Sequence, residues 1–130
     1  IHEMLQDTRP GAALSASVGP VRERALLHYQ DPEQWLERGL LDLLLPMNYT
    51  PNLEAFEQRL ERWVEVRDVP VAPGIMDREG KSQTARQQID IAREVNGNFC
   101  VFSFTALFDD SGVATAELIW IPHKLERLRA

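Results

Sequence analysis

Residues 39–51 read GLLDLLLPMNYTP, and this stretch decides the expected fold. Its apolar part, residues 40–45, is interrupted only at Asp42 and is bounded by a glycine and a proline. A short apolar run with such boundaries predicts a strand buried on both faces, which is typical of parallel sheets covered by helices. Asn48 and Tyr49 follow directly. Parallel α/β folds place their ligands just past the carboxyl ends of strands, so these two residues are candidates for the rim of a site.

The chain on either side of this strand alternates between further predicted strands and helices. The other strands are short runs of small or apolar residues at 12–18, 71–75 and 99–104. Apolar residues at helical spacing and helix-capping signals predict helices at 1–8, 31–39, 53–67 and 82–95, with a helical tail at 124–129. Such alternation with short connections is typical of parallel βα units. We therefore predict an α/β fold with four parallel strands, which form either a small open sheet or half of an eight-stranded barrel.

Capping residues mark the boundaries of the helix before the central strand. Asp31 is predicted to cap the helix that Pro32 begins, with Gln34 as its capping-box partner, and Gly39 is predicted to end it. Residues 19–30 are harder to assign because a proline and mixed charges come first, and they predict a loop with a short helical turn. Long loops in compact domains often carry function.

The composition is that of a globular domain. The 130 residues are 44% hydrophobic and 26% charged, and they predict one domain, residues 1–130, whole or part of a larger protein. The net charge is −6, with arginine and lysine dispersed among acids, so no nucleic-acid partner is expected. No apolar run approaches the roughly 20 residues of a membrane span. The chain begins within a helical pattern at Ile1 and shows no leader peptide, which indicates a segment of a longer protein or a processed chain.

The residues that carry chemistry do not form a known metal or cofactor motif. The histidines lie far apart and lack acidic or cysteine neighbours at ligand spacing, which predicts no metal site; they are His2, His28 and His123. The sequence contains no glycine-rich phosphate loop, so no nucleotide cofactor is expected. It also contains no serine nucleophile elbow. Cys100 is the single cysteine, and its place in an apolar run predicts a buried, inert thiol.

Four groups of residues occur in a fairly specific order between about residues 10 and 107. They are Asp31-x-x-x-Trp35-Leu36-x-x-Gly39-Leu40-x-Asp42, Pro46-Met47-x-Tyr49, the segment 83–93 with Ala92-Arg93 and then Gly97, and the strand 99–104 with Phe102-Ser103. With these residues the chain resembles the C-terminal half of the bacterial glycosyl-hydrolase-like TIM barrels. That family was long filed as a domain of unknown function and is grouped with glycoside hydrolases.

The resemblance implies that the four strands are strands five to eight of a (β/α)8 barrel, followed by a C-terminal helical tail. The acidic catalytic residues of the family are expected mainly on the first half of the barrel, near the end of the fourth strand. No catalytic pair is therefore assigned within this chain. The resemblance also implies a carbohydrate substrate and an extracellular or cell-envelope location.

The candidate substrate-binding residues lie at the strand ends, and they are Ser17, Asn48, Tyr49 and Ser103. An aromatic ring with a polar tip and an amide match the apolar faces and hydroxyl edges of sugars. Glycoside hydrolysis commonly uses two carboxylates about 5–9 Å apart, but none of these strand-end residues is acidic. Asp42 lies at the opposite end of its strand and is expected to cap or pair locally. The acidic residues of the predicted rim loops are interpreted as solvated; they are Asp77, Glu79, Asp109 and Asp110.

Two hypotheses of different class follow from these features. In the first, the chain shapes the carbohydrate cleft of a barrel that hydrolyses O-glycosidic bonds, while the acid and base come from the other half. In the second, the chain is a non-catalytic half-barrel that binds or supports other molecules. A half-barrel leaves strand edges and one sheet face uncovered, so a homo-oligomer or an N-terminal half-barrel partner is expected. A flavodoxin-like regulatory domain is a weaker third alternative, because the strand ends lack an acidic cluster.

Overall fold

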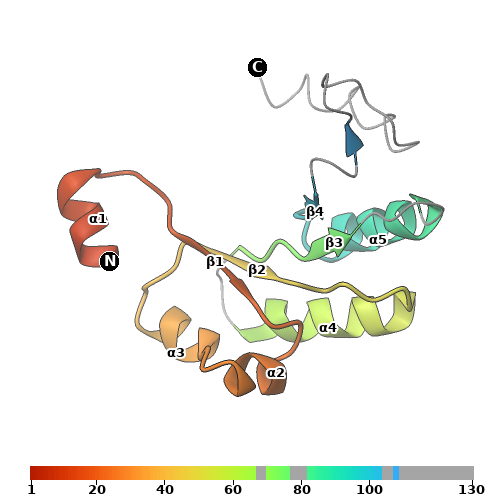
Figure 1. Cartoon of the computed structure of the whole chain (residues 1–130), viewed down its shortest axis with the longest axis horizontal. Helices are drawn as coiled ribbons and strands as arrows, with labels where there is room; N and C mark the ends of the chain where they lie inside the picture. Colours follow the sequence, from red (N-terminus) through yellow and green to blue (C-terminus); the bar gives the residue numbers. More distant parts are fainter. Residues whose placement is uncertain (67–69, 77–81, 104–106, 109–130) are drawn as a thin grey trace.

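The computed structural model describes residues 1–66, 70–76, 82–103 and 107–108. Its elements follow the order α1 (His2–Thr8), β1 (Ser15–Val18), α2 (Arg22–Leu27), α3 (Pro32–Glu37), β2 (Leu43–Pro46), α4 (Leu53–Val66), β3 (Gly74–Met76), α5 (Ser82–Val95) and β4 (Cys100–Phe102) (Figure 1). The strands pair in parallel, which confirms the predicted α/β class at this level. Every predicted rim-loop acid and the predicted helical tail at 124–129 lie outside the described residues.

Strands that are consecutive in the sequence are also neighbours in space. β1 pairs in parallel with β2, and β3 pairs in parallel with β4. A single parallel bridge between Leu44 and Val71 joins the two pairs. At this bridge the Leu44 N–H donates to the Pro70 carbonyl at 3.0 Å, and the Ala72 N–H donates to the Leu44 carbonyl at 2.9 Å. Among the described elements, β1, β2 and β3 are each followed by a helical connection and then by the next strand.

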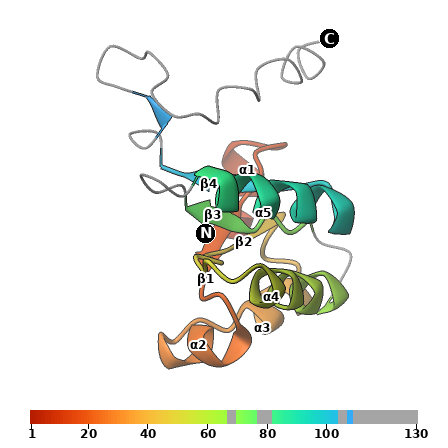
Figure 2. The ribbon, with the colours of Figure 1, turned by 90° about the vertical axis from the view of Figure 1, so that its right-hand side faces the viewer.

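One face of the strands packs against the helices and forms the core. Val18, Leu44 and Ile75 supply the strand side, and each is completely buried. The helices contribute Leu36, Phe56, Leu60, Trp63, Ala85, Ile89 and Ala92. The apolar faces predicted for the two long helices are thus the faces that pack. Figure 2 shows α4 and α5 running beside the strands, and the two helices contact one another.

The opposite face of the strands is much more open, and two predictions about it are wrong. Leu43 and Leu45 are only half-buried, so β2 is not buried on both faces. Cys100 is exposed, and Phe102, on the same side of β4, is 53% exposed. The physical reason is that side chains alternate between the two faces of a strand. The core residues of the described helices pack against the side of Val18 and Leu44, so the alternate residues stay open.

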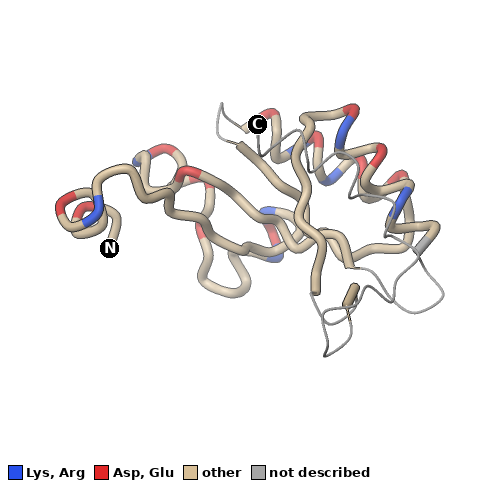
Figure 3. The backbone as a smooth tube through the Cα atoms, turned by 90° about the horizontal axis from the view of Figure 1, so that it is seen from above, with Lys and Arg blue, Asp and Glu red and all other residues tan. Residues whose placement is uncertain are grey.

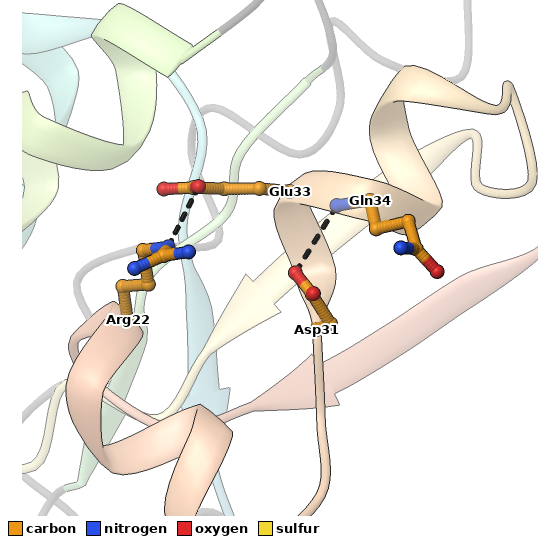
Figure 4. A network of polar contacts seen from close by, with 4 residues as sticks. All are labelled: Arg22, Asp31, Glu33 and Gln34. Atoms are coloured by element: carbon orange, nitrogen blue, oxygen red, sulfur yellow. Dashed lines mark hydrogen bonds and ion pairs between the residues drawn. The ribbon is translucent and has the colours of Figure 1, made fainter.

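The amino-terminal cap predicted at Asp31 is confirmed, but within the described residues the Gln34 side chain does not make the reciprocal bond of a capping box. The Asp31 carboxylate accepts a hydrogen bond from the Gln34 N–H at 3.2 Å, and Pro32 is the first helical residue (Figure 4). Asp31 thereby satisfies one of the N–H groups that lack a partner at the start of a helix.

The carboxyl end of α3 explains why β2 begins later than predicted. Gly39 has φ 62°, its N–H donates to the Leu36 carbonyl, and the next N–H, of Leu40, donates to the Trp35 carbonyl. These are the two hydrogen bonds of a Schellman motif, in which glycine takes the left-handed position. Leu40 belongs to this turn, so the strand starts at Leu43.

Residues 19–30 contain a complete short helix where the sequence predicted a loop with one helical turn. This helix, α2, has Val21 at its N-cap, and no side chain caps it. Because the N-cap is not Ser, Thr, Asp or Asn, the sequence gives no signal that a helix starts there. Ala25 is fully buried against the end of β1 and anchors α2.

Charged residues are kept off the strands. None of the four strands contains Lys, Arg, Asp or Glu, and Figure 3 shows both signs interspersed along the helices. Across the residues that the structure describes, no helix combines the length and apolar character needed to cross a membrane.

Candidate functional site

Parallel pairing brings the carboxyl ends of neighbouring strands to one edge, and the predicted site residues come from that edge. Ser17 lies in β1, Asn48 and Tyr49 follow β2, and Ser103 follows β4. The four residues nevertheless have different surroundings. In the described part of the chain, no hydrogen bond links the side chains of Ser17, Asn48 and Tyr49 to one another.

Tyr49 forms an aromatic pair with Phe102, the last residue of β4. The ring centroids are 6.0 Å apart and the rings are tilted by 33°, within the range of favourable aromatic contacts. The Tyr49 ring also lies against Gly74 of β3, where an added Cβ would come within 3.0 Å of its Cε1 atom. Glycine at position 74 is therefore what lets the ring lie across the strand ends. We call Tyr49 and Phe102 the aromatic pair.

The Tyr49 hydroxyl is a neutral hydrogen-bond donor at physiological pH. Burial raises the pKa of Tyr49 above its ordinary value of 10.0, and its electrostatic interaction with Cys100 raises it further. Both effects disfavour the phenolate. The exposed Phe102 ring and the half-buried Tyr49 ring thus combine an apolar surface with one donor and acceptor.

Asn48 lies beneath the rim. Its side chain is 1% exposed, and its amide NH2 donates to the Phe56 carbonyl at 2.8 Å. Its amide oxygen accepts from the Arg59 guanidinium at 3.4 Å. Both partners belong to α4, so Asn48 ties the end of β2 to that helix. Contact between Asn48 and a substrate stays a prediction.

The two serines differ in their surroundings. The Ser17 side chain is exposed, and its carbonyl accepts from the Gln30 amide at 3.3 Å. The Gly19 N–H donates to the oxygen of the same amide at 3.1 Å. Gln30 therefore occupies the carboxyl end of the outer edge of β1, where a neighbouring strand would otherwise bond. Ser103 is half-buried and follows Phe102 across a cis peptide bond.

Sequence reasoning missed Phe102 and Gly74 as parts of this site. Alternation along the strand at 99–104 places Cys100 and Phe102 on one face, and this signal was available before the structure. The place of Gly74 beneath the tyrosine ring depends on strand pairing, which no local pattern encodes.

Acidic residues do not converge at this rim within the described chain. Asp42 lies at the amino end of β2, where its carboxylate accepts from the Leu14 N–H at 2.7 Å and its own N–H donates to the Leu14 carbonyl. The expected pairing role of Asp42 is thus confirmed. Among the residues described, no group of three or more His, Cys, Asp or Glu is placed to hold a metal ion.

The aromatic pair is accordingly the feature of this edge with the clearest chemical character. It combines an exposed apolar ring with a phenol held in place by packing. Comparisons of the chain with protein-family models, with curated proteins and with solved structures find no match.

Proposed function

We propose that the chain forms one wall of a carbohydrate cleft in a glycoside-hydrolase-like (β/α)8 barrel. It would correspond to strands five to eight, and the complete barrel would hydrolyse O-glycosidic bonds. The observation that carries the proposal is the aromatic pair at the carboxyl ends of parallel strands. Pyranose rings present apolar faces that stack on aromatic rings and hydroxyls that bond to a phenol. Parallel barrels bind their substrates at this end of the strands.

The arrangement of the strands supports the same proposal. Four strands follow one another in chain order, and helices connect them, as in successive βα units of a barrel. The open face carries Leu43, Leu45 and Phe102, which are apolar and incompletely buried. In a closed barrel such inward side chains fill the interior in layers. A second half would cover them and would supply the catalytic acid and base.

Replacing Tyr49 by alanine is expected to weaken polysaccharide binding at least about tenfold, which corresponds to about 1.4 kcal/mol. The loss follows from removal of the stacking surface and the hydroxyl together. Affinity electrophoresis against bacterial cell-wall and plant polysaccharides measures it. Tyr49→Phe should retain most of the binding, because the ring remains.

The matched control is Tyr29→Ala, which removes the same side chain from a position that is 98% exposed. Its binding should equal that of the unchanged chain. Equal binding by Tyr49→Ala and Tyr29→Ala would rule out the aromatic pair as a sugar platform. Binding to none of the polysaccharides would count against the cleft altogether.

The second candidate is a non-catalytic half-barrel that self-associates and binds or supports other molecules. The specific observation is the open sheet face, with Phe102 53% exposed and Cys100 exposed. Within the described chain, β1 and β4 each pair with one strand, and no described strand pairs with their other edge. A two-fold axis parallel to the strands would set β4 of each copy beside β1 of the other, in parallel. Near the end of β1, the Gln30 amide would have to break its hydrogen bonds with Ser17 and Gly19 before such pairing could form.

Self-association predicts a mass twice that of a single chain by size exclusion with light scattering. Phe102→Asp should convert the dimer to a monomer, because a carboxylate would be buried in the joined face. Leu27→Asp is the control, since Leu27 is 78% exposed on α2 and lies outside that face. A monomeric unchanged chain at high concentration, or equal effects of the two substitutions, would contradict this function.

A further inference from the structure

A separate cavity of about 170 Å³ lies among α2, α3 and α4. Arg59, Arg62 and Trp63 of α4 form one wall, and Arg22 of α2 and Glu33 of α3 form the other. The remaining lining residues are Val21, Glu23 and Val66. This cavity lies among the helices, whereas the aromatic pair lies at the strand ends.

The charges around this cavity leave positive charge unbalanced. Three guanidinium groups face two carboxylates. Arg22 and Glu33 neutralise one another through a 2.7 Å ion pair (Figure 4). Arg59 and Arg62 lie three residues apart on one face of α4. Within the described residues, neither of them makes an ion pair.

A hydrogen bond to a buried side chain positions Arg59. Its guanidinium donates to the amide oxygen of Asn48 at 3.4 Å. Asn48 is itself fixed by its 2.8 Å hydrogen bond to the Phe56 carbonyl and is 1% exposed. A guanidinium positioned in this way loses less side-chain freedom when it binds an anion. Asn48 therefore acts as a positioning residue for the cavity.

Part of the cavity lining is apolar. Trp63 is 3% exposed, and its indole N–H donates to the Pro20 carbonyl at 3.0 Å. Val21 and Val66 border the same space. The volume resembles that of a cavity known to hold benzene, about 150 Å³, and is smaller than typical drug-sized pockets of about 300–1,000 Å³. Its ligand is accordingly small.

We infer that this cavity binds a small organic anion, namely a carboxylate carried on an apolar body about the size of one ring. Arg59 and Arg62 take the carboxylate through charge-assisted hydrogen bonds, which are stronger than neutral ones. The Trp63 wall takes the apolar body. Neither role depends on the proposed carbohydrate cleft, so the two proposals are tested separately.

The test follows the Trp63 indole N–H signal by ¹H–¹⁵N NMR of the whole chain, with Trp63→Phe to assign it. Benzoate should shift this signal saturably. Neutral benzamide at the same concentrations should leave it unchanged, because it lacks the charge. Inorganic phosphate should bind more weakly than benzoate, because it lacks the apolar body.

Substitutions then locate the anion. Arg62→Gln and Arg59→Gln should each weaken benzoate binding about tenfold, and Arg24→Gln, an equal loss of charge on α2 outside the lining, should leave it unchanged. Arg62 is exposed, so its variant folds even if Arg59→Gln does not. The inference is overturned if benzoate gives no saturable shift, if benzamide or phosphate binds as tightly, or if Arg62→Gln binds as well as the unchanged chain.

Discussion

Replacing Asn48 by alanine is expected to lower the free energy of unfolding by about 2 kcal/mol. The substitution removes the only side-chain donor to the Phe56 carbonyl in the described residues, and the amide that makes this bond is 1% exposed. The Phe56 carbonyl lies within α4 and keeps its helical partner, so the substitution removes one buried hydrogen bond, worth about 0.5–1.5 kcal/mol. The space left by the amide adds a packing loss. The Arg59 guanidinium loses its 3.4 Å acceptor as well, with little further cost because Arg59 is partly exposed. Urea denaturation measures the change.

Asn52→Ala is the matched control for this prediction. Asn52 is exposed, and its side chain caps α4 by accepting from the Ala55 N–H at 2.8 Å. Loss of such a cap costs about 1 kcal/mol. An Asn48→Ala variant no less stable than Asn52→Ala would show that the amide is not what ties β2 to α4. In that event a direct substrate role for Asn48 would gain weight.

The course of the chain was largely predictable because local rules and tertiary packing agree. Asp31 and Gly39 bound α3 as their chemistry requires. The apolar stripe of α4 is the face that is buried, with Phe56, Leu60 and Trp63 inside. Val21, at the start of α2, provides no capping side chain, and the complete helix there was not predicted.

Burial was less predictable, because it depends on what covers each face. The run at 99–104 is apolar except at Ser103, and this pattern predicted a buried Cys100. In the structure Val101 packs against the core while Cys100 and Phe102 are exposed. An apolar residue on an open face and one in a core look the same in a sequence. The arrangement of neighbouring helices decides between them.

The candidate site was predictable only in position. A polar and aromatic cluster after β2 predicted the rim, and Tyr49 lies there. The orientation of Asn48 toward α4 depends on where the Phe56 carbonyl lies, eight residues later. Likewise, the spacing of Arg59 and Arg62 shows a shared helix face, but the opposite wall of their cavity comes from α2 and α3. Neither the polar cluster after β2 nor the spacing of the two arginines predicts contacts with residues of other elements.

Replacing Gly19 by alanine is expected to destabilise the chain by about 3 kcal/mol, the upper part of the usual range for an overpacked position. A Cβ at Gly19 would lie 2.7 Å from the Ala25 nitrogen and 3.0 Å from its Cα. Both atoms belong to the backbone of α2, so no side-chain rotation relieves the contact. The helix would have to move away from the end of β1, and Ala25, which is now fully buried, would lose its packing. Thermal and urea denaturation measure the loss.

Two comparisons separate this clash from a general effect of alanine. Gly39→Ala places a Cβ in open space but at φ 62°, and the left-handed strain there costs about 1–2 kcal/mol. Gly19→Ala should therefore be the less stable of the two variants. Adding Ala25→Gly should not restore it, because the atoms that clash remain when the methyl group is removed. Rescue by Ala25→Gly, or a Gly19→Ala variant as stable as Gly39→Ala, would mean that α2 does not lie directly on the end of β1. The wall that Arg22 gives to the cavity depends on the same contact, so Gly19→Ala should weaken benzoate binding as well.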